Sequence, residues 1–320
     1  MRVVVALGGH ALLRRGEETS IEKQRDTVRI ACDALALVAI DNELVVTHGN
    51  GPQVGLLALQ SLGRPDVPPF PIDVLDAETQ GMIGYLLERE LANSLRSDKP
   101  LATLLTMVEV DRDDPALRDP TKPIGPFYDK DMAEKLTAEF GWTVKPDGDS
   151  FRRVVPSPAP RRILGLSQIG WLLERRCVVI CAGGGGIPTA CQPGGQLVGV
   201  EAVIDKDRTS ALLATGIEAR VLVIAMDVDG VHLDWGKPTA RRIGRVHPDA
   251  LMEHAAQFDV GSMRPKVDAA CQFVKATGGT AAIGGVTDLS GMLQERAGTI
   301  VTLDADGIEF HPPTRAGGRT

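Results

Sequence analysis

The stretch LVVTHGNGPQVG, residues 44–55, predicts most about the fold. An apolar run ends at HGNGP, residues 48–52, and a helical pattern follows, which indicates a strand, a tight loop and the start of a helix. Gly49 and Gly51 allow a ligand to approach the backbone closely, and the first N–H groups of a helix carry partial positive charge. The stretch therefore predicts an anion-binding loop.

Two other apolar runs end in glycine in the same way. VVVAL, residues 3–7, runs into Gly8 and Gly9, and VVICA, residues 178–182, runs into four glycines at 183–186. A single corner of this kind can use glycine for turn geometry alone. Three together predict that strand ends converge on a phosphate-bearing ligand.

Composition indicates a soluble globular protein. The chain has 320 residues, of which 43% are hydrophobic and 24% charged, and its net charge is −7. Its length suits one large α/β unit or two lobes, and its acidity argues against a broad nucleic-acid surface. The five cysteines are scattered without a CxxC pair, so neither a disulfide framework nor a zinc site is indicated. We find no signal peptide and no membrane-length apolar run, and expect a cytoplasmic protein.

Helical and strand patterns alternate along the chain, which is typical of a mainly parallel sheet covered by helices. We expect helices at residues 21–40, 76–95, 163–176, 209–215 and 265–276, and strands at residues 43–47, 101–110, 221–225, 280–283 and 298–303. Residues 111–160 interrupt this alternation with prolines and charges, and we expect them to form an ordered subdomain that acts as a lid. Residues 312–320 are expected to be a flexible tail.

The phosphate-binding signals are not those of common nucleotide-binding motifs. Neither GxGxxG at Rossmann spacing nor GxxxxGK[ST] occurs. Phosphoryl transfer needs cations near the moving group, and three lysines stand in restricted or charged contexts: Lys122, Lys206 and Lys266. A single lysine is ordinarily a solvated surface residue, but these contexts favour a functional role.

Nine motifs occur in an order that resembles the carbamate kinases of the amino-acid kinase family: VVALGGHALL, THGNGPQVG, AETQGMIGY, PTKPIGPFY, RRVVPSPAP, CAGGGGIP, GVEAVIDKD, DVDGV and GSMRPKV. The resemblance runs from residue 3 to about residue 301. It implies an α/β fold, namely a three-layer αβα sandwich with a mainly parallel sheet and a protruding subdomain at 111–160. An N-terminal lobe at about 1–205 would bind carbamate, and a C-terminal lobe at about 206–303 would bind the nucleotide.

The activity implied by the resemblance is reversible phosphoryl transfer between ATP and carbamate, giving ADP and carbamoyl phosphate. Magnesium would accompany the nucleotide, no protein metal ligand is assigned, and the protein would be a homodimer. The alternatives are another amino-acid kinase acting on a carboxylate, or a non-catalytic nucleotide-binding partner of a carbamoyl transferase. PTKPIGPFY argues against the first, and the retained charged residues argue against the second.

The resemblance also implies site residues. Those around the transferring phosphoryl group and carbamate would be Gly8, Gly9, His10, Gly49, Asn50 and Gly51. Catalytic roles would belong to Lys122, Lys206, Asp207 and Lys266, with Asp207 orienting the lysines by ion pairing. The nucleotide would contact Gly184, Gly185, Lys206, Asp227, Asp229, Gly230 and Lys266, although a plain turn is the alternative for residues 227–230.

One site position departs from the family. The first loop usually reads Gly-Gly-Asn, whereas this chain has His10. A histidine in that loop would add a titratable group beside the substrate anion. The alternative is that its ring packs away from the site.

Overall fold

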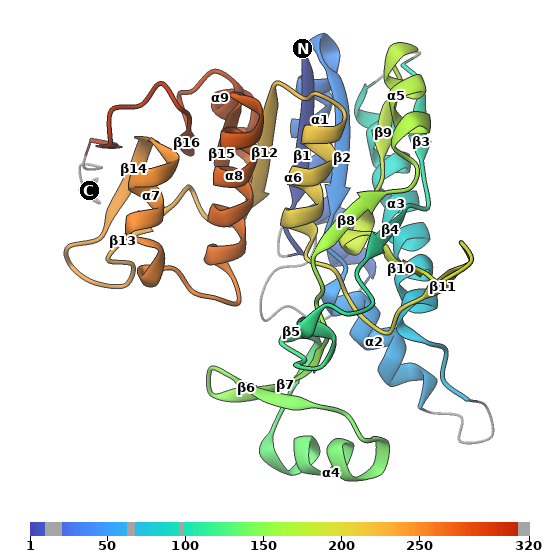
Figure 1. Ribbon diagram of the computed structural model, residues 1–320. Helices are drawn as coiled ribbons and strands as arrows, with labels where there is room; N and C mark the ends of the chain where they lie inside the picture. Colours follow the sequence, from blue (N-terminus) through green and yellow to red (C-terminus); the bar gives the residue numbers. More distant parts are fainter. Residues whose placement is uncertain (10–20, 63–67, 96–98, 313–320) are drawn as a thin grey trace.

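The computed structural model describes residues 1–9, 21–62, 68–95 and 99–312. Its centre is a ten-stranded sheet in the order β13-β14-β16-β15-β12-β1-β2-β9-β3, with β17 paired to β14 (Figure 1). The strands are β1 (Arg2–Leu7), β2 (Glu43–His48), β3 (Leu101–Thr103), β9 (Val178–Ile180), β12 (Val221–Met226), β13 (His232–Leu233), β14 (Arg241–Val246), β15 (Thr280–Gly285), β16 (Thr299–Val301) and β17 (Ile308–Phe310).

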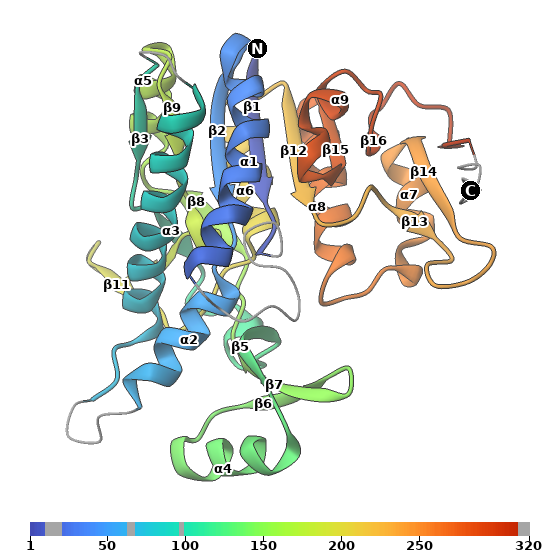
Figure 2. The same ribbon diagram turned by 180° about the vertical axis from the view of Figure 1, so that it is seen from behind.

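Helices cover both faces of this sheet (Figures 1 and 2). One face packs against α1 (Ile21–Asp41), α3 (Ile72–Leu95) and α9 (Leu289–Leu293), and the other against α5 (Leu166–Glu174), α6 (Lys206–Gly216), α7 (Pro248–Glu253) and α8 (Met263–Thr277). Successive residues of β1 supply the two cores alternately: Val3 and Val5 face one, and Val4 and Ala6 the other. The expected α/β sandwich with a mainly parallel sheet is confirmed. None of the helices in the described part of the chain is long and apolar enough to cross a membrane.

The strand expected at residues 101–110 is wrong, because the chain leaves the central sheet halfway along it. β3 ends at Thr103, and β4 (Met107–Val110) belongs to a second sheet with β8 (Pro160–Ile163), β10 (Ile187–Cys191) and β11 (Leu197–Gly199). The change of sheet occurs at Thr106, whose N–H donates to Gln80 Oε1 at 2.9 Å. A side chain on α3 thus takes the bond that a sheet neighbour would have made.

Four helix starts also differ from expectation. α3 begins at Ile72 rather than at residue 76, and α8 begins at Met263 rather than at residue 265. The helix expected from residue 163 begins at Leu166, because Ile163 pairs with Val108 in the second sheet. α6 begins at Lys206 rather than at residue 209. Asp205 caps it by accepting from the N–H groups of Asp207, at 2.9 Å, and Arg208, at 3.2 Å. Because the first turn of α6 is polar, the spacing of apolar residues does not reveal where this helix begins.

The segment 111–160 includes the expected ordered excursion (Figure 1). β5 (Lys122–Tyr128), β7 (Ser150–Val155) and β6 (Val144–Asp147) form a three-stranded sheet that carries α4 (Lys130–Phe140). β5 rests on α2 (Gly51–Ser61), the helix that follows the first-quoted loop. At this contact Gly55 and Gly125 lie so close that a Cβ on Gly55 would be 2.1 Å from Gly125 Cα.

We predict that Gly55→Ala destabilises the protein by about 1–3 kcal/mol or more, because backbone on one side of the contact must move. The displaced strand is β5, so turnover should fall as well. Gly81→Ala is the matched control: Gly81 also lies in a helix, with no atom within 4 Å of its added Cβ. That change should stabilise by roughly 0.5–1 kcal/mol. Denaturant unfolding checks both, and equal stability of the two variants would contradict the close contact.

Candidate active site

The glycine loops that follow β1 and β2 meet at one end of the sheet. Leu7 is the register partner of both His48 in β2 and Ala225 in β12, so these parallel strands end side by side. Gly8 N–H donates to Ala225 O at 2.8 Å, and Gly49 N–H donates to Leu7 O at 3.1 Å. A Cβ on Gly49 would lie 3.1 Å from Gly9 N. The convergence predicted from the glycine pattern is therefore present for these two loops.

The third loop, Gly183–Gly185, packs against the second. Gly184 and Gly185 have φ of +69° and +98°, in the region that favours glycine. A Cβ on Gly184 would lie 2.2 Å from Asn50 Nδ2, and one on Gly185 would lie 2.3 Å from Ile204 O. These two glycines are thus required for close packing as well as for turn geometry.

The N-terminus of α2 opens at the same place. Asn50 occupies the N-cap position, yet its side chain makes no capping hydrogen bond. Pro52 follows and has no N–H of its own. The first-turn donors near Gly51 are therefore left without this cap, and they can receive an anion.

Three charged residues, of which Lys206 and Asp207 are buried and Lys266 is half-buried, form a cluster beside these loops. Lys206 donates to Asp207 Oδ1, and Lys266 Nζ donates to Asp207 Oδ2 at 3.2 Å. Asp207 is 2% exposed, and a Cβ on Gly49 would lie 3.6 Å from the Lys206 side chain. The ion pairs predicted for Asp207 are both present, and they hold two ammonium groups next to the β2 loop.

Burial and charge oppose each other in this cluster. Burial alone would raise the pKa of Asp207, but the two lysines outweigh it and hold that pKa below its usual value. Burial lowers the pKa of Lys206 despite the opposing pull of Asp207. For Lys266, the carboxylates of Asp207 and Asp205 outweigh burial and raise the pKa. Lys206 therefore depends most on Asp207 to stay charged.

Lys122 reaches the cluster from the protruding subdomain. It begins β5 and forms a hydrogen-bonded ion pair with Asp205 Oδ2. Burial would raise the pKa of Asp205, but the attraction of Lys122 and Lys206 holds it below its usual value. Asp205 was not among the site residues predicted from the sequence. The available signal was an aspartate directly before a helix start, the position of an N-cap.

The predicted nucleotide residues at 227–230 separate into two groups. Asp227 lies near enough to Lys266 to raise its pKa. Asp229 instead accepts from Arg242 Nη1 at 2.8 Å and bonds to His232 Nε2 at 2.8 Å. Asp229 thus belongs to an ion pair separate from the lysine cluster, whereas the negative charge of Asp227 acts on Lys266. A Cβ on Gly230 would lie 2.9 Å from Thr299 Oγ1, so packing requires this glycine.

The predicted substrate residue His10 lies outside the described residues. Within the described ranges, no group of three or more His, Cys, Asp or Glu side chains is arranged to hold a metal ion. The described candidate site consists of glycine backbone, a helix N-terminus, and lysines paired with Asp205 and Asp207.

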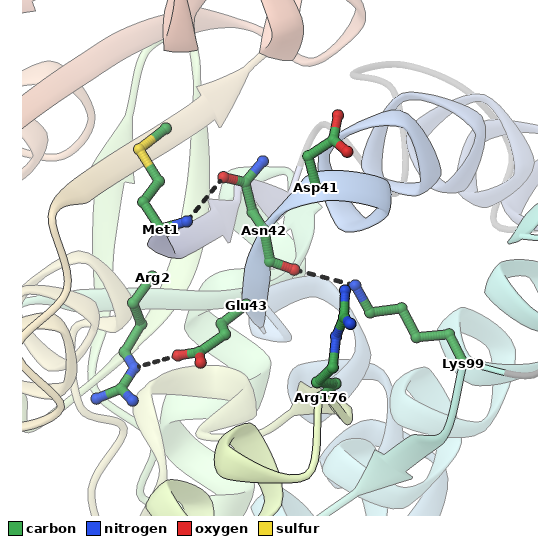
Figure 3. A pocket seen from close by; sticks show the side chains of 7 residues that line it. All are labelled: Met1, Arg2, Asp41, Asn42, Glu43, Lys99 and Arg176. Atoms are coloured by element: carbon green, nitrogen blue, oxygen red, sulfur yellow. Dashed lines mark hydrogen bonds and ion pairs between the residues drawn. The ribbon is translucent and has the colours of Figure 1, made fainter.

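A cavity of about 340 Å³ lies at the other end of β1 and β2 (Figure 3). Three of its charged side chains are already engaged: Arg2 Nε pairs with Glu43 at 2.8 Å, and Lys99 donates to Asn42 O at 3.1 Å. It contains none of the predicted site residues. The lysine cluster therefore remains the candidate site.

Comparison with known proteins agrees with this arrangement. The model of the amino acid kinase family matches residues 1–284. The carbamate kinase of Haemophilus influenzae is 53% identical over 311 residues, covering 97% of this chain and all of that protein. The carbamate kinase of Thermococcus kodakarensis is 43% identical over 314 residues, or 95% of this chain and 99% of that protein.

A solved structure shows the same fold. Carbamate kinase from Giardia lamblia bound to AMP-PNP is 34% identical and superposes with a TM-score of 0.85, covering 94% of this chain and 98% of that one. The family model spans most of the chain, and the relatives cover nearly all of it. The chain therefore belongs to the amino acid kinase family.

Proposed function

We propose that this protein is a carbamate kinase, which transfers the terminal phosphoryl group of ATP to carbamate and can run in reverse. The observation that carries the proposal is the Lys206–Asp207–Lys266 cluster beside the glycine loops, in a chain 53% identical to a protein named carbamate kinase. Relatives with that name span the whole length of the fold. The amino-acid kinase alternative with a plain carboxylate acceptor has no comparable support among these relatives.

The transfer requires few protein groups. A carbamate oxygen attacks the terminal phosphorus, the bond from phosphorus to the bridging oxygen breaks, and its electron pair leaves with ADP. Negative charge on the moving group is met by Lys206 and Lys266, while the uncapped N-terminus of α2 supplies backbone donors. Because carbamate is already anionic, positioning carries most of the catalysis.

Lys122 has a different role in this scheme. It comes from the protruding subdomain, and its partner Asp205 is also the N-cap of α6, the helix that carries Lys206. Asp205 therefore links the position of the subdomain to that of the cluster. We assign Lys122 the role of neutralising charge on the phosphoryl group during its transfer. The subdomain then acts as a lid that completes the site.

Magnesium enters with the nucleotide in this proposal, so the substrate is MgATP. The test is the chemistry of the site: Asp207 is shared by two ammonium groups and is not free to hold a cation. In this proposal the ion is therefore held by the nucleotide phosphates and not by Asp207. A homodimer and a cytoplasmic location belong to the same proposal, as do the lobes at 1–205 and 206–303 and the nucleotide contacts of Gly184, Gly185 and Gly230.

The function is tested by mixing the purified protein with ADP, magnesium and carbamoyl phosphate and following ATP with a luciferase reaction. The proposal expects rapid ATP formation that requires both substrates. No ATP above a protein-free control, from folded protein, would contradict it.

The lysines give the first mechanistic prediction. Lys206→Ala and Lys266→Ala should each lower kcat by about 10²–10³, the usual cost of removing a donor aimed at developing charge. Lys122→Ala should lower kcat more than it raises the KM for ADP, because its partner is the moving group. Lys145→Ala is the control: Lys145 lies in the same subdomain and forms an exposed ion pair with Asp119. Turnover by Lys206→Ala or Lys266→Ala comparable to that control would remove the lysine from the mechanism.

His48 is the last residue of β2 and directly precedes the Gly49 loop. Its ring is buried, with Nδ1 3.2 Å from Gly49 O, and an added Cβ on Gly183 would lie 2.3 Å from Nε2. Burial, opposed by the hydrogen bond to Gly49 O and reinforced by the charge of Lys206, lowers its pKa from 6.5 to about 4. His48 is therefore neutral at physiological pH and is not needed as a base.

We predict that His48 stays neutral from pH 8 down to pH 5. Because its folded pKa lies below its unfolded pKa, the unfolded chain gains the proton first as pH falls. The resulting loss of stability grows as the pH falls from 6.5 to about 4, where it reaches ~3 kcal/mol. Imidazole NMR shifts recorded against pH check this, with His48→Gln to assign the signal. A midpoint near 6.5 would contradict the buried neutral ring.

A further inference from the structure

The side chain of Asn50 is held by two acceptors on α3. Its Nδ2 donates to Asp76 Oδ1 at 2.7 Å and to Thr79 Oγ1 at 2.9 Å. The Thr79 hydroxyl donates its own hydrogen to Asp76 O, at 2.9 Å. It can therefore only accept a hydrogen bond from Asn50. Both hydrogens of the Asn50 amide are therefore used, and the amide has one orientation.

This orientation leaves the amide oxygen available. Asn50 Oδ1 accepts no hydrogen bond from the described residues, and it does not cap α2, although asparagine usually does so at this position. Gly184 packs directly on the amide, since its added Cβ would lie 2.5 Å from Asn50 Cγ. The group beside the anion-binding loop is thus a fixed hydrogen-bond acceptor, not a donor to phosphate.

Asp76 holds this group at a cost to stability. The residue is fully buried, its Oδ2 has no hydrogen-bond partner, and burial raises its pKa well above the usual range. A buried carboxyl with an unpaired oxygen is unfavourable for folding. Oδ1 accepts from Asn50 whether the carboxyl is charged or neutral. A residue kept at such a cost beside a ligand site indicates a functional role.

We propose that Asp76 and Thr79 are positioning residues that aim Asn50 Oδ1 at the amino group of carbamate, so that the site prefers an amino-bearing substrate to a methyl-bearing one. The inference rests on the proposed function. Carbamate and carbamoyl phosphate carry an NH₂ that donates a hydrogen bond, whereas acetate and acetyl phosphate have a methyl group of similar size that cannot. A site built around a hydrogen bond discriminates against an analogue that lacks the donor.

The test compares the two acyl phosphates as donors to ADP, with ATP formation measured for each. The variants are Thr79→Val, which removes one acceptor at nearly constant volume, and the double variant Asp76→Leu with Thr79→Val, which removes both. Without these acceptors the amide can turn and present its NH₂ to the substrate NH₂. Thr79→Ser keeps the hydroxyl and serves as the conservative rescue.

We expect kcat/KM for carbamoyl phosphate to fall about tenfold in the double variant, the effect of losing one hydrogen bond of about 1.4 kcal/mol. For acetyl phosphate the fall should be less than about threefold, since a methyl group makes no such bond. The kcat/KM of Thr79→Val for carbamoyl phosphate should lie between those of the wild type and the double variant. Thr79→Ser should restore the preference for carbamoyl phosphate over acetyl phosphate. Melting temperatures verify that each variant folds.

Equal losses on both acyl phosphates, or a Thr79→Ser variant no better than Thr79→Val, would overturn the assignment and leave Asp76 and Thr79 as structural residues. A wild-type protein that uses acetyl phosphate but not carbamoyl phosphate would overturn the proposed function itself. The two failures are therefore distinguishable in one set of assays.

Discussion

Two lysine ammonium groups share one buried carboxylate, Asp207, and the phosphate end of the candidate site depends on this arrangement. Without a counter-charge, two cations this close together and shielded from water would repel each other and lose protons. Asp207 lies in the first turn of α6, whose cap is Asp205, so one helix start places both carboxylates. Asp205 in turn binds Lys122 from the protruding subdomain. Three cations from three parts of the chain are thereby positioned by one polar turn.

The glycine loops complement this cluster with backbone. Parallel strands β1, β2 and β12 end side by side, and the absence of side chains at Gly8 and Gly49 lets the loops approach one another. The next residue, Asn50, is turned away from capping by α3, which leaves the start of α2 open. Charge from lysines and donors from backbone thus face the same region. This combination suits a phosphoryl group, whose charge is spread over several oxygens.

Much of this arrangement could be predicted from the sequence, because the patterns concerned are local. Glycine after an apolar run marks a strand end, and alternating helix and strand patterns predict a parallel sheet. The three lysines were identified by their restricted or charged sequence contexts, and Asp207 through motif resemblance. The change from the central sheet to the second sheet at Thr106 was not predicted. It involves a hydrogen bond to a side chain on α3, and the spacing of apolar residues does not reveal that contact. Asp76 was missed for the same reason: its importance lies in bonds to Asn50, distant in sequence.

The central claim is that Asp207 keeps Lys206 charged, and the pH profile of Asp207→Asn tests it most directly. Asp207 raises the pKa of Lys206 against the effect of burial, so removing its charge should lower that pKa further. The falling alkaline limb of kcat for ATP formation should therefore move to lower pH, by about one unit or more for an interaction of about 1.4 kcal/mol. A profile that is lower in amplitude but unshifted from that of the wild type would contradict the account.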